Sequence, residues 1–276
     1  MFATLAAAAI VGMVIGILSG TLGIGGGLIM VPAFRLAFGM PPMGATATSL
    51  FTIIPTSISG TVAHIRGKTC IPKLGLALGV GGACTSPLGV WLAQISTGGL
   101  VMTAAALVIC YSGFTMFRKA LEAPREGKAT PGTERANAPA STPQEAPDLD
   151  HSPAQLAKTA LIGAVAGLAS GYVGLGGGFI MVPLLLSITN LPMKLTSGTS
   201  LIAVMVLAMP AAVAQCALGN IDFAVGIATA CGTIPGAAIG AHLVRRIPER
   251  ALRFAFACFL VIAAALLATK ELGLLG

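Results

Sequence analysis

The sequence predicts an all-α, polytopic membrane protein that consists of two related halves. Of its 276 residues, 55% are hydrophobic and only 9% are charged, whereas soluble domains carry roughly 25% charged residues. Long apolar stretches recur along the chain, and most approach the ~20 residues with which a helix crosses a bilayer. The sequence lacks the alternating polarity of membrane β-barrels, so backbone hydrogen bonds are expected within helices.

The predicted spans are the long stretches that carry almost no charge. They are residues 3–18, 45–63, 74–95, 98–117, 156–171, 197–217, 223–243 and 251–269. The first has no basic residue before it and leads into glycine-rich sequence, so we predict a retained helix rather than a secretory signal. Two further apolar runs, residues 28–38 and 179–189, are too short to cross alone at ~1.5 Å per residue. Each is expected to form part of a hairpin, which gives about 8–10 transmembrane segments in all.

Residues 118–155 interrupt the apolar pattern. This segment is rich in Pro, Ala, Thr and charged residues and has no apolar periodicity, which predicts a flexible, solvated linker. It divides the chain into a first membrane repeat, residues 1–117, and a second membrane repeat, residues 156–276. The sequence gives no indication of the linker's purpose.

The two halves share a motif at a constant offset. Gly12–Pro32 (GMVIGILSGTLGIGGGLIMVP) matches Gly163–Pro183 (GAVAGLASGYVGLGGGFIMVP) at an offset of 151 residues. The same offset pairs Thr48-Ser49-Leu50 with Thr199-Ser200-Leu201. Matches of this length at one spacing indicate a duplication.

Loop charges predict that the halves have opposite orientations. The loop after the span at residues 45–63 is basic, whereas its equivalent around residues 218–222 carries only an acid. In the second half the basic loop follows one span later, at residues 242–253. Because Lys and Arg favour the cytoplasmic side, this shift indicates inverted repeats. We therefore expect a multi-pass protein of the bacterial inner membrane, with a cytoplasmic linker and both termini in the periplasm.

Each copy of the motif contains glycines that interrupt an apolar helix. Paired breaks at membrane depth point to a substrate site at the repeat interface, where glycine lets a ligand approach bare N–H groups. The helix after each break presents free N–H groups and about +0.5 charge, which can hold an anion. Nearby hydroxyl groups complete a neutral, donor-rich cage. The predicted substrate-binding residues are Ser19, Thr21, Gly25, Gly26, Gly27, Thr48, Ser49, Ser170, Gly176, Gly177, Gly178, Thr199 and Ser200.

Other interpretations of these and neighbouring residues stay open. The glycines could serve only to let helices pack closely. Arg35 could bind the anion or extend to the membrane interface, and its equivalent Leu186 is apolar. His64 and Gln215 occupy equivalent span ends, where each could contact substrate or serve only the topology of its loop.

Catalytic and metal chemistry find no support in the sequence. The six cysteines occur singly, without CxxC or Cys/His spacing, which predicts inert thiols and no metal site. The spans contain no HExxH motif, acidic pair or nucleophile with a base. We expect no enzyme activity, no cofactor and no nucleic-acid partner, because contact with membrane lipid explains the basic loops.

The repeated motif (L/A)SGxxGxGGGxxMVP, with a Thr-Ser-containing second span, resembles the sulfite exporter TauE/SafE family of membrane permeases. The resemblance covers both halves and leaves out only the linker. It implies transport of a small sulfur oxyanion or sulfonate, such as sulfite or sulfoacetate, through the breaks at Gly25–Gly27 and Gly176–Gly178, without a prosthetic group. We therefore expect a secondary transporter, chiefly an exporter, and the alternative is a channel for a small neutral solute. The substrate, the coupling ion and homo-oligomer formation are left open.

Overall fold

The chain is entirely helical in the part that the structure describes. The computed structural model describes residues 2–122, 153–189 and 191–271, and it contains no strand within them. The helices are α1 (Phe2–Leu22), α2 (Gly27–Ala37), α3 (Pro42–Arg66), α4 (Pro72–Gln94), α5 (Gly98–Glu122), α6 (Pro153–Val173), α7 (Gly178–Thr189), α8 (Met193–Ala217), α9 (Phe223–Leu243) and α10 (Glu249–Glu271). Each predicted apolar stretch falls on one of these helices, and the predicted and observed ends differ by at most five residues. The all-α prediction is therefore confirmed.

Several helices are long and apolar enough to cross a membrane. Among the described residues, the five segments that qualify by length and hydropathy are Leu5–Leu22, Pro72–Gln94, Gly98–Thr115, Met193–Ala217 and Phe223–Leu243. Large apolar side chains also cover the outside of the bundle, since Ile10, Tyr111 and Val213 are 69%, 71% and 68% exposed. Such a surface fits contact with lipid rather than water. The chain is a polytopic membrane protein.

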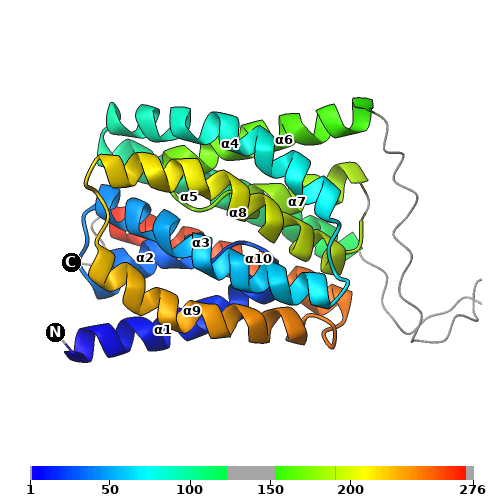
Figure 1. Cartoon of the computed structure of the whole chain (residues 1–276), viewed down its shortest axis with the longest axis horizontal. Coiled ribbons are helices and arrows are strands. Elements are labelled where there is room, and N and C mark those ends of the chain that lie inside the picture. The colour runs from blue at the N-terminus through cyan, green and yellow to red at the C-terminus, as the bar shows by residue number, and fades with distance from the viewer. Residues whose placement is uncertain (1, 123–152, 190, 272–276) are drawn as a thin grey trace, which may run out of the picture.

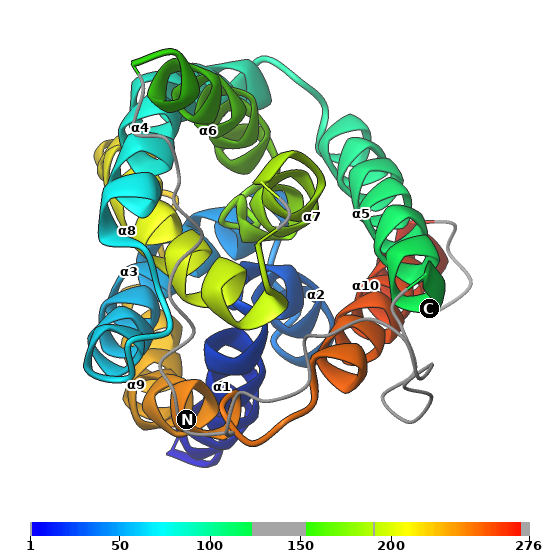
Figure 2. The same cartoon turned by 90° about the vertical axis from the view of Figure 1, so that its right-hand side faces the viewer.

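The long helices of one half pair with helices of the other half. α1 packs along α9, α4 along α6 and α5 along α10, while α3 contacts both α8 and α9. Figure 2 looks along the bundle and shows α2 and α7 in its interior, between the α5–α10 pair and the other long helices. The short helices are thus the central ones.

The pairing pattern stays the same when the two halves are exchanged. The offset of 151 residues relates α1 to α6, α3 to α8 and α4 to α9, so the α1–α9 pair corresponds to the α6–α4 pair. In Figure 1, α1 and α6 begin at opposite ends of the bundle. An inverted repeat requires this arrangement.

Glycines bring the paired helices into backbone contact. A Cβ atom on Gly16 of α1 would lie 2.5 Å from the carbonyl oxygen of Thr233 in α9. A Cβ atom on Gly167 of α6 would collide with the backbone of Gly82 in α4. These glycines therefore serve close helix packing, which is the alternative role that the sequence left open for the glycines of the breaks.

The predicted linker at residues 118–155 lies largely outside the described residues. α5 runs to Glu122 and α6 begins at Pro153, and residues 123–152 are not described. The division into repeats at residues 1–117 and 156–276 stays a prediction, as does the cytoplasmic position of the linker.

Candidate functional site

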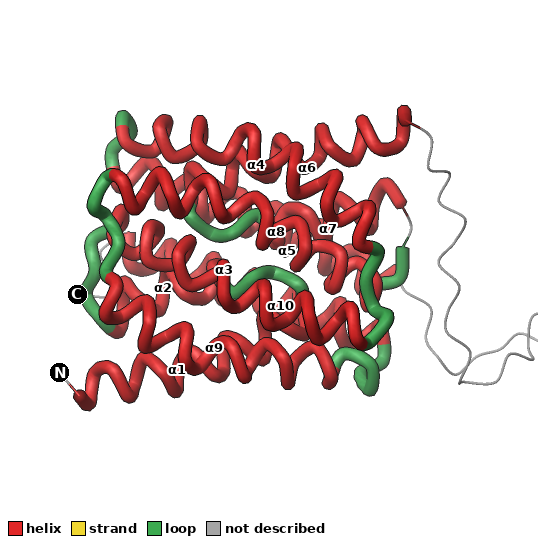
Figure 3. The backbone as a smooth tube through the Cα atoms, viewed as in Figure 1, coloured by secondary structure: helices red, strands yellow, loops and turns green. Residues whose placement is uncertain are grey.

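The two glycine breaks lie in the middle of the bundle. The first joins α1 to α2 and the second joins α6 to α7. Figure 3 shows these two loops inside the bundle, whereas the other described loops lie at its ends. The glycines with positive φ in the breaks are Gly23 (76°), Gly25 (72°), Gly26 (87°), Gly174 (75°), Gly176 (79°) and Gly177 (67°). Because other residues adopt this backbone only at a steric cost, the glycines determine where each helix is interrupted.

The two breaks contact each other across the interface between the halves. A Cβ atom on Gly27 would lie 2.6 Å from the carbonyl oxygen of Leu175, and one on Gly178 would lie 2.8 Å from that of Gly23. All residues of both breaks are buried. The structure thus brings the predicted site glycines of both halves together at one place.

Each break is held by a serine from the other half. Ser200 Oγ of α8 donates a hydrogen bond to the carbonyl oxygen of Gly23 at 2.7 Å, and Ser49 Oγ of α3 donates to that of Gly174 at 2.5 Å. These residues are equivalent by the 151-residue offset. The predicted site residues Ser49 and Ser200 therefore lie at the breaks, where their hydroxyl groups bind backbone.

α2 begins without a capping side chain. Its N-cap residue, Gly26, has φ 87° and ψ −18°, and no side chain caps the helix. Ile29 and Met30 both donate to the carbonyl oxygen of Gly26 at 3.1 Å, whereas the N–H groups of Gly27 and Leu28 find no backbone acceptor in the described part of the chain. These N–H groups, with the positive end of the helix dipole, can bind an anion.

Three serine hydroxyl groups next to the breaks have no hydrogen-bond partner among the described residues. They belong to Ser19 of α1, its equivalent Ser170 of α6, and Ser57 of α3, and all three residues are 0% exposed. A Cβ atom on Gly26 would lie 3.5 Å from Ser19 Cβ, and one on Gly25 would lie 3.4 Å from Ser57 Oγ. A buried hydroxyl group without a partner costs about 1–3 kcal/mol. A ligand that accepts hydrogen bonds from these hydroxyl groups would remove this cost.

The remaining predicted hydroxyl groups are engaged elsewhere. Thr21 Oγ1 donates to two carbonyl oxygens of its own helix, at 3.0 Å each. Thr48 Oγ1 accepts a hydrogen bond from the N–H of Asp222, and Thr199 Oγ1 accepts one from the N–H of Ile71, both at 3.0 Å. These bonds attach α3 and α8 to the loops that precede α9 and α4. Direct contact of these threonines with a substrate stays a prediction.

Sequence reasoning missed Ser57 and Thr61 of α3. The hydroxyl group of Thr61, which is 5% exposed, also has no partner among the described residues. The equivalent residues of α8 are Ala208 and Ala212. Thr52 and Thr56 also pair with apolar residues at the 151-residue offset, so a comparison of the two spans alone does not single out Ser57 and Thr61.

His64 and Gln215 lie at opposite ends of the bundle in equivalent settings. His64 Nδ1 lies 2.7 Å from Thr69 Oγ1, and Gln215 Oε1 accepts a hydrogen bond from Asn220 Nδ2 at 2.8 Å. Only His64 also reaches α1 among the described residues, with Nε2 at 2.9 Å from the carbonyl oxygen of Gly20. Both side chains are buried. Each therefore fixes the end of its helix to the following loop.

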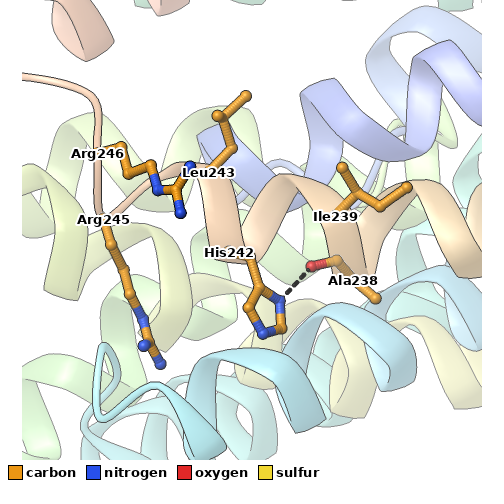
Figure 4. A pocket seen from close by; sticks show the side chains of 6 residues that line it. All are labelled: Ala238, Ile239, His242, Leu243, Arg245 and Arg246. Atoms are coloured by element: carbon orange, nitrogen blue, oxygen red, sulfur yellow. Dashed lines mark hydrogen bonds between the residues drawn. The ribbon is translucent and has the colours of Figure 1, made fainter.

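Pockets at the two ends of α9 differ in charge. One, of about 560 Å³, is lined by Ala238, Ile239, His242, Leu243, Arg245 and Arg246. Figure 4 shows His242 and Arg245 extending to the same side of it. The other pocket, of about 490 Å³, lies where α9 begins and includes Asp222. We refer to the first as the basic pocket.

Metal binding finds no candidate in the described residues. No group of three or more His, Cys, Asp or Glu side chains is close enough there to hold a metal ion. Arg35 lies in the last turn of α2, at the end of the helix away from the break. The donors at the breaks are therefore uncharged N–H and O–H groups.

A lipid-facing helical bundle whose halves meet at two buried helix breaks has the architecture of a membrane transporter. The chain matches the model of the sulfite exporter TauE/SafE family over residues 8–267, and it belongs to this family. It is therefore a transporter and not an enzyme.

The relatives have names of the same kind. "Probable membrane transporter protein YunE" of Bacillus subtilis (strain 168) is 24% identical over 251 residues, which cover 88% of this chain and 89% of the relative. "Probable membrane transporter protein YjnA" of the same organism is 25% identical over 266 residues, which cover 92% and 95%. A "Probable membrane transporter protein" of Xylella fastidiosa (strain 9a5c) is 24% identical over 250 residues, which cover 89% and 85%. No solved structure matches the chain.

Proposed function

We propose that the protein is a secondary transporter that exports small sulfur-containing anions, such as sulfite, sulfoacetate or other organosulfonates, across the inner membrane. The observation that carries this proposal is the uncapped start of α2 beside the unpartnered hydroxyl groups of Ser19 and Ser57. N–H and O–H donors without a charged side chain suit an oxyanion that must also be released. The family match supports sulfur as the central element of the substrate.

The second break starts its helix in the same way, although the N–H of Gly178 donates to the carbonyl oxygen of Gly176 at 2.8 Å. Ile180 and Met181 both donate to the carbonyl oxygen of Gly177 at 3.0 Å, as Ile29 and Met30 do to Gly26. An anion held between the breaks would face two helix starts, each with about +0.5 charge. Rocking of one half against the other would carry it between the two sides, because the breaks lie at the interface of the halves.

The first test is thermal stability of the detergent-purified protein with sulfite, sulfoacetate, taurine, sulfate, thiosulfate, chloride or glycerol. A ligand at about a hundred times its Kd adds roughly 2.7 kcal/mol to the free energy of unfolding. We expect a sulfur anion to raise the melting temperature and glycerol to leave it unchanged. A rise with the neutral solute alone would contradict the proposal and favour a channel for neutral solutes.

Serine variants separate binding from folding in this test. Ser19→Ala and Ser170→Ala remove hydroxyl groups that have no partner among the described residues. Each variant should keep or exceed the wild-type melting temperature without ligand, since an unsatisfied buried group is lost. Each should nevertheless show a smaller shift with the anion. A full anion shift in both variants would contradict a direct role of these hydroxyl groups.

A further inference from the structure

α3 carries a row of three buried polar side chains, and its equivalent, α8, has a polar residue at only the last of these positions. Ser57, Thr61 and His64 lie at spacings of four and three residues, which places them on one face of the helix. They are 0%, 5% and 0% exposed. The equivalent residues of α8 are Ala208, Ala212 and Gln215. The two halves therefore differ along the helix that follows each hairpin.

Contacts at both ends of the row place it beside α1 and the first break. Ser57 Oγ lies 3.4 Å from the position of a Cβ atom on Gly25. His64 Nε2 lies 2.9 Å from the carbonyl oxygen of Gly20 in α1. Thr61 lies about one turn from each of the other two, and its hydroxyl group has no partner among the described residues. The row thus leads from the break toward the C-terminal end of α3.

The row ends next to the basic pocket. A Cβ atom on Gly67, which directly follows α3, would lie 2.9 Å from Arg245 Nε. His242 and Arg245 both line the basic pocket. Arg246 lines the same pocket (Figure 4). Cationic side chains at the entrance of a passage raise the local concentration of anions.

We infer that the transported anion passes between the breaks and the basic end along α1 and α3 of the first half, rather than along α6 and α8, with the basic pocket as its vestibule. This inference rests on the proposed anion transport. Hydroxyl groups of Ser57 and Thr61 replace hydrogen bonds that the anion loses when it leaves water. The methyl groups of Ala208 and Ala212 offer none along α8.

Cysteine accessibility tests the passage without any knowledge of the substrate. In a variant without the native cysteines, Thr61→Cys is compared with Val62→Cys and with Ala212→Cys. Val62 neighbours Thr61 but is 43% exposed on the outside of the bundle, and Ala212 is the equivalent of Thr61. The reagents are the anionic sulfonatoethyl and the cationic trimethylammonioethyl methanethiosulfonates. Unchanged melting temperatures show that the variants fold.

We expect the anionic reagent to modify Thr61→Cys roughly tenfold faster than either comparison variant, as local anion enrichment allows. Addition of Arg245→Gln and Arg246→Gln should slow this reaction and should not slow that of the cationic reagent. Equal rates at Thr61→Cys and Ala212→Cys, or no reaction at Thr61→Cys, would overturn the inference. Fast reaction at Thr61→Cys in a protein that binds no sulfur anion would support the passage and reject the proposed substrates.

Discussion

Ser49 and Ser200 hold the breaks through hydrogen bonds that cross between the halves. Ser49 Oγ donates to the carbonyl oxygen of Gly174 at 2.5 Å, and both partners are buried. Ser49→Ala leaves this carbonyl without the bond, so we expect the free energy of unfolding to fall by about 1–3 kcal/mol. Thermal denaturation in detergent measures the loss. Thr103→Ala removes an exposed hydroxyl group bonded to its own helix, so its free energy of unfolding should change much less. Equal losses in the two variants would contradict a stabilising role of the hydrogen bond between Ser49 and Gly174.

Gly25 and Gly219 share a backbone conformation but not their surroundings. Their φ angles are 72° and 70°. A Cβ atom on Gly25 would lie 2.6 Å from Val204 Cγ1, whereas one on Gly219 would meet no atom within 4 Å. Both alanine variants carry about 1–2 kcal/mol of left-handed strain, but only Gly25→Ala also displaces a buried side chain. The melting temperature of Gly25→Ala should therefore fall further than that of Gly219→Ala. Equal falls in the two variants would show that only the backbone strain matters.

The sequence could predict where the breaks lie but not which hydroxyl groups stay without a partner. Glycine clusters at equal positions in both halves locate the breaks, because the backbone conformation requires glycine there. Ser19 and Ser49 belong to the same predicted set, yet only Ser49 bonds a carbonyl oxygen of the other half. That difference depends on how the halves pack, which no local pattern records. Ser57 escaped prediction for the same reason.

At the scale of elements, α1 uses glycine for packing as well as for its break. Gly12, Gly16 and Gly20 recur every fourth residue and face α9. Gly16→Leu would push a side chain into the backbone of Thr233, so we expect a loss of at least about 1–3 kcal/mol or failure to fold. The yield of monodisperse protein and its melting temperature report the effect. Val14→Leu, on the exposed side of the same helix at 56% exposure, is the control and should be nearly neutral.

The helices themselves could be predicted closely, but their partners could not. Apolar stretches located the helices, with ends that differ by at most five residues, and the runs at residues 28–38 and 179–189 predicted the short lengths of α2 and α7. The pairing of α1 with α9 and of α4 with α6 depends on complementary surfaces from both halves. Glycines that recur at every fourth residue indicate close helix packing, but they do not identify the partner helix.

At the scale of the whole molecule, the two ends of the bundle differ in charge. Lys194 Nζ donates to the carbonyl oxygen of Arg245 at 3.2 Å, and Arg245 contacts Gly67. Because Arg66 and Lys68 of the first half flank Gly67, basic residues of both halves gather at one end of the bundle. The opposite end has the pocket that includes Asp222. Because Lys and Arg favour the cytoplasmic side, we propose that the basic end faces the cytoplasm.

Lys73 and Ala224 test this orientation and the inversion of the repeats together. They are equivalent by the 151-residue offset, both are exposed, and they lie in the first turns of α4 and α9. In a variant without the native cysteines, a membrane-impermeant maleimide added to intact cells with a permeabilised outer membrane should label Ala224→Cys. Lys73→Cys should react only after the inner membrane is opened, because inverted repeats place equivalent residues on opposite sides.

The two other labelling patterns are equally informative. Labelling of Lys73→Cys alone would keep the inverted repeats but place the basic end in the periplasm, against the expectation from loop charge. Equal labelling of both variants in intact cells would contradict inversion. The arrangement of α1 and α6 in Figure 1 favours labelling of only one of the two variants, since these equivalent helices begin at opposite ends of the bundle.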